Sequence, residues 1–93
     1  MYRRIVNFID DLNCESIILN IRFVSKKRLY GKLRSDGIKY LWGLNTAQYV
    51  IIENSNLRAF KSERDIPENY KIVTLFEDGN GYYFKEKIGV KSI

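Results

Sequence analysis

Apolar residues in the first twelve positions recur at helical spacing, with most polar residues on the other side. The apolar side consists of Ile5, Phe8, Ile9 and Leu12. The pattern predicts a helix over residues 2–12 that ends at Asn13, a residue that tolerates a left-handed cap. Its arginines precede its aspartates, opposite to what the helix dipole favours, so this helix needs tertiary packing.

From Ser16 onward the spacing of apolar residues changes, and they occur at every second position, as in a strand. Leu19, Ile21 and Phe23 alternate with other residues, and Leu29, Gly31 and Leu33 alternate with Arg28, Tyr30, Lys32 and Arg34. Asp36-Gly37 follows, a dipeptide typical of a tight type I′ hairpin turn. The sequence therefore predicts a hairpin over residues 28–44, in which Leu33 faces Tyr40 and Gly31 faces Trp42.

The second half of the chain predicts further strands. Residues 47–53 and 57–60 indicate strands separated by Asn54-Ser55-Asn56, and a charged loop follows at 61–69. Residues 70–76 and 82–88 predict a hairpin across 78–81. The expected fold class is α+β: an N-terminal helix packed on an antiparallel, strongly twisted sheet or small barrel of five to seven strands, forming a single domain over residues 1–93.

The alternation also predicts which side chains form the core. The expected buried set is Ile5, Phe8, Ile9, Leu19, Ile21, Phe23, Leu33, Tyr40, Trp42, Val50, Ile52, Val73 and Leu75. Tyr82 and Tyr83 are neighbours in a strand and point to opposite faces, so one of the two rings should be exposed.

The sequence lacks the residues that several common catalytic and metal-binding sites require. There is no histidine, and the lone Cys14 builds neither a thiolate metal site nor an internal disulfide. Adjacent carboxylates occur in turn and surface contexts, and the glycines at 79 and 81 do not form a phosphate-binding loop. We therefore expect no catalytic residues, no metal site and no cofactor, and a protein that is not an enzyme. A histidine-free enzyme built on carboxylates is the third and least favoured alternative.

The positive charge is concentrated in one stretch. The formal net charge is +5, but residues 22–39 contain seven basic residues and one acidic residue, a local charge of +6. The predicted register places most of these cations on one sheet face around an exposed Tyr30. The candidate binding residues are Arg22, Lys26, Lys27, Arg28, Tyr30, Lys32, Arg34 and Lys39.

A basic sheet face with a central aromatic ring predicts contact with nucleic acid, or with a protein complex that carries it. The alternative is a protein-binding regulator or inhibitor that recognises an acidic surface, of the kind that phages or mobile elements encode to block a host machine. The lone cysteine and the absence of a long apolar run favour a cytoplasmic protein without membrane contact. The sequence does not define the oligomeric state.

Overall fold

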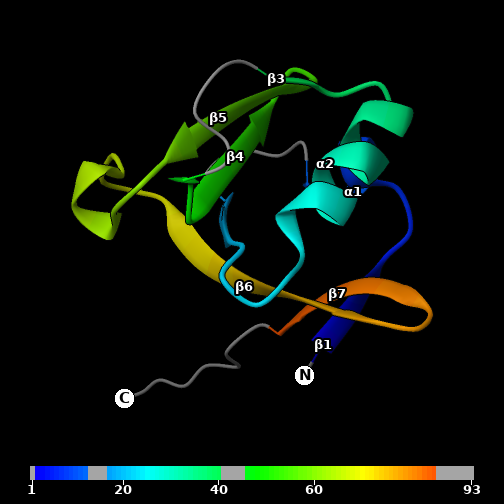
Figure 1. The fold of residues 1–93 in the computed structure, drawn as a ribbon. Helices are drawn as coiled ribbons and strands as arrows, with labels where there is room; N and C mark the ends of the chain where they lie inside the picture. The colour runs from blue at the N-terminus through cyan, green and yellow to red at the C-terminus, as the bar shows by residue number, and fades with distance from the viewer. Residues whose placement is uncertain (1, 13–16, 41–45, 86–93) are drawn as a thin grey trace.

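The computed structural model describes residues 2–12, 17–40 and 46–85, which form an α+β fold with two helices and a mixed sheet (Figure 1). The strands are β1 (Tyr2–Ile5), β2 (Ile17–Asn20), β3 (Lys39–Tyr40), β4 (Tyr49–Glu53), β5 (Asn56–Phe60), β6 (Lys71–Asp78) and β7 (Gly81–Lys85). The helices are α1 (Phe8–Leu12) and α2 (Lys26–Ser35), with a 3₁₀ turn, η2, at Glu63–Asp65. Figure 1 shows both helices on one side of a sheet that curves around them.

The strand order is β1-β7-β6-β2-β4-β5-β3. Most neighbouring strands are antiparallel, but β2 pairs with β6 and β3 pairs with β5 in parallel. The expectation of a wholly antiparallel sheet is therefore wrong at these two pairs. The physical reason is that α2 follows β2 and carries the chain over the sheet, so β2 does not return through a hairpin. No pairing between β1 and β3 occurs among the described residues, and the sheet is open there.

The N-terminal helix is shorter than the sequence predicts. Residues 2–5 form β1, an edge strand paired with β7, and the helix begins only at Phe8. Asn7 caps it, because its Oδ1 accepts the N–H of Asp10 at 3.2 Å. The carboxylate of Asp11 reaches back to the N–H groups of Val6 and Asn7. With this start the aspartates lie in the first turn, where the dipole favours them.

The predicted hairpin over residues 28–44 is wrong, because residues 26–35 form α2. Ser25 is its N-cap, and its side chain accepts the N–H of Arg28. Gly37 has a φ of +87° and donates to the carbonyl of Arg34, while the N–H of Ile38 donates to that of Leu33. These two bonds form a Schellman motif, so Asp36-Gly37 ends a helix here and does not turn a hairpin.

Two other hairpins confirm the sequence pattern. β4 and β5 pair across Asn54 and Ser55, whose φ angles of 52° and 62° suit a type I′ turn. β6 and β7 pair with Asp78 opposite Gly81, as the glycine-rich turn predicts.

The main core lies between the helices and the sheet, and it contains most of the expected residues. Those confirmed as buried are Ile5, Phe8, Leu19, Ile21, Leu33, Val50, Ile52, Val73 and Leu75. Ile9 is only half-buried, and Phe23 is wrong, since it is 57% exposed. Trp42 and the side chain of Tyr40 lie outside the described part of the structure.

The described residues cover only part of the opposite sheet face. A smaller cluster there contains Ile18, Tyr49 and Ile51, with Ile66 and Tyr70 from the segment between β5 and β6 packed against it. This cluster lies over β2 and β4. The faces of β6 and β7 beside it carry the partly exposed side chains described next.

Candidate functional site

The predicted basic sheet face does not exist as such, because most of its cations lie on α2. Lys26, Lys27, Arg28, Lys32 and Arg34 are helical, Arg22 lies in the turn before the helix, and Lys39 lies in β3. All are exposed except Lys26, which is half-buried. The sequence pattern thus located the cations correctly along the chain but assigned them to the wrong element.

The prediction of an exposed Tyr30 is also wrong. Its side chain is only 7% exposed and belongs to the core, together with Leu29 and Leu33 from the same helix. In a helix these three side chains share one face, whereas a strand would have placed Tyr30 on the opposite face from its neighbours. Tyr30 is therefore not an exposed stacking ring.

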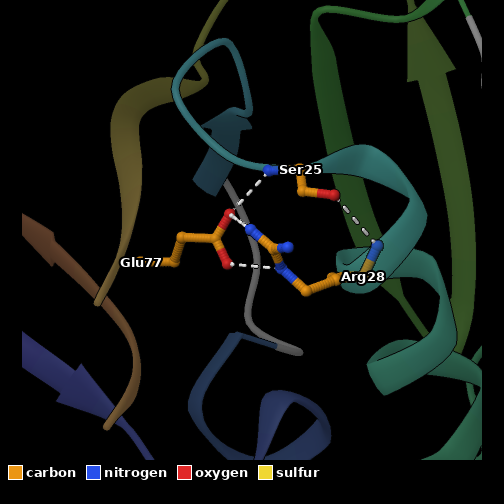
Figure 2. A network of polar contacts seen from close by, with 3 residues as sticks. All are labelled: Ser25, Arg28 and Glu77. Carbon is orange, nitrogen blue, oxygen red and sulfur yellow. Dashed lines mark hydrogen bonds and ion pairs between the residues drawn. The ribbon is translucent and has the colours of Figure 1, made fainter. Parts of the chain in front are cut away.

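Two cations of α2 are held in ion pairs by nearby carboxylates. Arg28 binds Glu77 in β6 through two hydrogen bonds of 3.2 and 3.3 Å, and the backbone N–H of Ser25 donates to the same carboxylate at 2.7 Å (Figure 2). The Ser25 N–H and then the Arg28 guanidinium lower the pKa of Glu77 below its usual range. Lys32 pairs with Asp36 one turn later at 3.4 Å. These cations have partners that offset part of their charge.

A second flank of α2 presents Lys27, Gly31 and Arg34, spaced at i, i+4 and i+7 on the exposed side. Gly31 has an ordinary helical φ, and a Cβ added there would meet no atom within 4 Å. Glycine inside a helix destabilises it by roughly 0.5–1 kcal/mol relative to alanine. Between Lys27 and Arg34, Gly31 leaves the helix backbone open to close approach by a partner.

A row of stacked side chains lies on the sheet face opposite the helices. The Phe23 and Phe76 rings are nearly parallel, with centroids 5.7 Å apart and an interplanar angle of 8°. Tyr83 continues the row, 5.5 Å from Phe76 and at 21°. The guanidinium of Arg22 lies 5.6 Å from the Phe23 centroid, and that of Arg4 lies 5.5 Å from the Tyr83 centroid. We call these five residues the aromatic row.

The two ends of the aromatic row differ in charge. Arg4 is held by Asp78 through two hydrogen bonds of 2.8 and 3.1 Å. The bonds from Arg4, followed by the N–H of Asn80, lower the pKa of Asp78. Arg22 takes part in none of the ion pairs formed within the described residues, so no carboxylate among those residues offsets its charge.

The aromatic row and α2 meet where the chain crosses the sheet. Phe23 precedes the helix cap Ser25 by two residues and stacks on Phe76, while Ser25 contacts Glu77 on the helix side. Phe76 and Glu77 are consecutive in β6, so their side chains point to opposite faces. One segment of chain thus joins the ring system to the basic helix.

Reasoning from the sequence missed most of the aromatic row. Arg22 was among the predicted binding residues, and one of the neighbouring rings Tyr82 and Tyr83 was expected to be exposed. Phe76 and Arg4 were not predicted, and Phe23 was assigned to the core. The sequence did contain a signal for an apolar group at Phe76 on the second sheet face. Ile72 and Phe76 alternate with Val73 and Leu75, which places apolar groups on both faces of β6. The stacking of Phe23 on Phe76 depends on the parallel pairing of β2 with β6, which no local pattern indicates.

A hollow of about 400 Å³ lies at the β1 edge of the sheet, near the turn between β6 and β7. It is lined by Arg4, Ile5, Val6, Phe8, Lys32, Asn80, Gly81 and Tyr82. Burial raises the pKa of the Tyr82 phenol. Within residues 2–12, 17–40 and 46–85, no three carboxylates or thiols come together as metal ligands would.

Comparison with known proteins identifies no relative: no family model, no curated protein and no solved structure matches the chain. Neither helix in the described part of the chain combines the length and apolar character that crossing a bilayer requires.

Proposed function

We propose that the protein is a non-enzymatic binding protein whose partner is nucleic acid, contacted through the cations of α2 and its flanks. The supporting observation is the distribution of charge. Residues 22–39 carry +6, while the rest of the chain has nine basic and ten acidic residues. Such a concentration of exposed cations attracts a polyanion, since each phosphate that is neutralised releases counterions.

The flank formed by Lys27, Gly31 and Arg34 suits this role best. Lys27 and Arg34 lie on the exposed side of α2, about two turns from each other across Gly31, which has no side chain to keep a phosphate at a distance. Phosphate contacts of this kind hold the partner without reading its sequence. We infer a cytoplasmic setting, as the lone cysteine indicates.

The test is a binding titration with labelled oligonucleotides at about 50 mM and about 200 mM salt, the range over which phosphate contacts weaken strongly. In one variant Lys27, Arg34 and Lys39 are changed to Glu. In the matched control Lys61, Arg64 and Lys71, which are exposed cations outside residues 22–39, are changed to Glu. Both variants change the net charge equally, so a difference between them reports the location of the contact.

We expect the first variant to lose at least about tenfold in affinity and to flatten the salt dependence, while the control loses far less. A wild-type protein that binds neither DNA nor RNA at low salt would refute the proposal. Equal losses in the two variants would also refute it, because net charge alone would then explain binding.

A second candidate function is a protein-binding regulator or inhibitor with an acidic partner surface. The observation in its favour is the exposure of apolar side chains: Phe23, which follows Arg22, is 57% exposed and Ile72 is 39% exposed. Aromatic and arginine side chains anchor many protein interfaces. In that case salt would change mainly the association rate, and one or two side chains would dominate an alanine scan.

A further inference from the structure

We propose that the aromatic row binds the unpaired bases of single-stranded nucleic acid. This inference rests on the proposed function and makes it more specific, because cations alone do not distinguish single strands from duplexes. The bases would stack on the rings of the row, while the cations of α2 and Arg22 hold the phosphates.

The geometry of the rings supports stacking. Phe23, Phe76 and Tyr83 are close to parallel, and their centroid separations of 5.7 and 5.5 Å mean that each ring is offset from the next. An offset arrangement leaves part of each ring surface uncovered by its neighbour. Phe23, with 57% of its surface exposed, offers the largest free area. Rings in such rows accept bases of any sequence, since every base has a π-face.

The cations at the ends of the row support an anionic occupant. Arg22 lies over Phe23 and Arg4 lies over Tyr83, so each end of the ring system carries a guanidinium group, and that of Arg4 is paired with Asp78. A guanidinium plane next to an aromatic ring both stacks on a base and binds a phosphate. An apolar protein surface would gain little from this arrangement, whereas a chain of bases and phosphates uses both kinds of group.

The row and α2 lie on opposite faces of the sheet, and the chain between Phe23 and Ser25 passes from one face to the other, which is where a bound strand would have to cross. Phe23 lies two residues before the helix cap, and Lys27 lies in the first turn of α2. A strand with its bases on Phe23 would therefore have its backbone beside the N-terminal end of the Lys27–Arg34 flank. A duplex does not fit this description, because its bases are stacked and paired and do not present their faces.

The experiment compares a single-stranded 12-mer that carries 2-aminopurine with the same sequence as a duplex. The variant is Phe23→Ala, at a position that is 57% exposed, and a thermal melt checks its fold. The control is Phe60→Ala, a ring in β5 that also has an arginine, Arg58, 5.4 Å from its centroid but lies outside the row. A second matched pair, Arg22→Ala and Arg58→Ala, tests the cations without removing a ring.

We expect Phe23→Ala to weaken single-strand binding about tenfold or more, to leave duplex binding within about twofold, and to abolish the change in 2-aminopurine fluorescence that stacking causes. Phe23→Trp should retain both signals. Phe60→Ala and Arg58→Ala should have little effect, and Arg22→Ala should weaken single-strand binding more than Arg58→Ala does.

The experiment distinguishes a failure of the aromatic-row inference from a failure of the proposed function. If Phe23→Ala binds single strands as well as the wild type does, while the Lys27, Arg34 and Lys39 variant binds weakly, the aromatic-row inference is wrong and the proposed function stands. If the wild type binds no nucleic acid, both are wrong, and a protein partner that requires Phe23 becomes the explanation for the row.

Discussion

The backbone N–H of Ser25 donates a 2.7 Å hydrogen bond to the Glu77 carboxylate, which ties the N-cap residue of α2 to β6, an interior strand of the sheet. Arg28 binds the same carboxylate from the first turn of the helix (Figure 2). Glu77 therefore satisfies a backbone donor and a cation at once, and it connects the basic helix to the strand that carries Phe76.

Replacing Glu77 should lower stability in a pH-dependent way. Because the folded-state pKa of Glu77 lies below its unfolded value of about 4.3, the contribution is present above that pH and is lost as the pH falls through the folded pKa. We expect Glu77→Gln to destabilise the protein by about 1–2 kcal/mol at pH 7 and much less at pH 3. Urea denaturation at both pH values measures this. Glu68→Gln, an exposed change in the loop before β6, should have little effect at either pH.

The two glycines near α2 should respond oppositely to alanine. Gly31→Ala should stabilise the protein by about 0.5–1 kcal/mol, because the helix gains a better helix former in open space. Gly37→Ala should destabilise it by about 1 kcal/mol or more, because φ at this position is +87°. Thermal melts of the two variants provide the measurement. A stabilising Gly37→Ala would contradict the Schellman motif.

Leu33 should be a strong determinant of stability. Its side chain is fully buried against the sheet, so Leu33→Ala should cost about 3 kcal/mol through lost burial and a cavity. Val6→Ala provides the control, since Val6 is 82% exposed and should change stability by less than about 0.5 kcal/mol. Chemical denaturation distinguishes the two, and similar losses would place Leu33 outside the core.

Asp78 should restrain the cation at one end of the aromatic row. Asp78→Asn keeps an oxygen for the N–H of Asn80 but removes the charge that holds Arg4. We expect single-strand affinity to rise a few-fold, and the slope of log affinity against log salt to steepen by up to about 0.7. Oligonucleotide titrations at several salt concentrations test this. An unchanged slope would mean that Arg4 does not reach a phosphate.

The hairpins of the second half were predictable because their turns use local chemistry. Asn54-Ser55 and the glycines near Asn80 suit left-handed or tight turns, and the flanking alternation fixes which residues face each other. The error at Asp36-Gly37 arose because glycine with a positive φ serves equally in a hairpin and at a helix end. The residues before it contained a further signal: no β-branched residue occurs over 26–35, and lysine, arginine and leucine are good helix formers.

The candidate site was less predictable than the fold. The charge of residues 22–39 was readable from the sequence, since it depends on composition alone. The stacking of Phe23 on Phe76 depends on how β2 and β6 pair, and a long-range parallel register leaves no mark in either segment. At the N-terminus the unfavourable order of arginines and aspartates did carry information, because it disappears once the helix begins at Phe8.

The parallel pairing of β2 with β6 also determines when the protein can fold. These strands are central in the sheet, yet they join residues 17–20 to residues 71–74. Contacts between such distant segments slow folding, because a long loop must close before they form. A nascent chain that has emerged only as far as β5 lacks one of the two neighbours of β2 and the core residues Val73 and Leu75. Stable folding must therefore wait until β6 has left the ribosome, and the aromatic row is complete only when β7, which carries Tyr83, has followed.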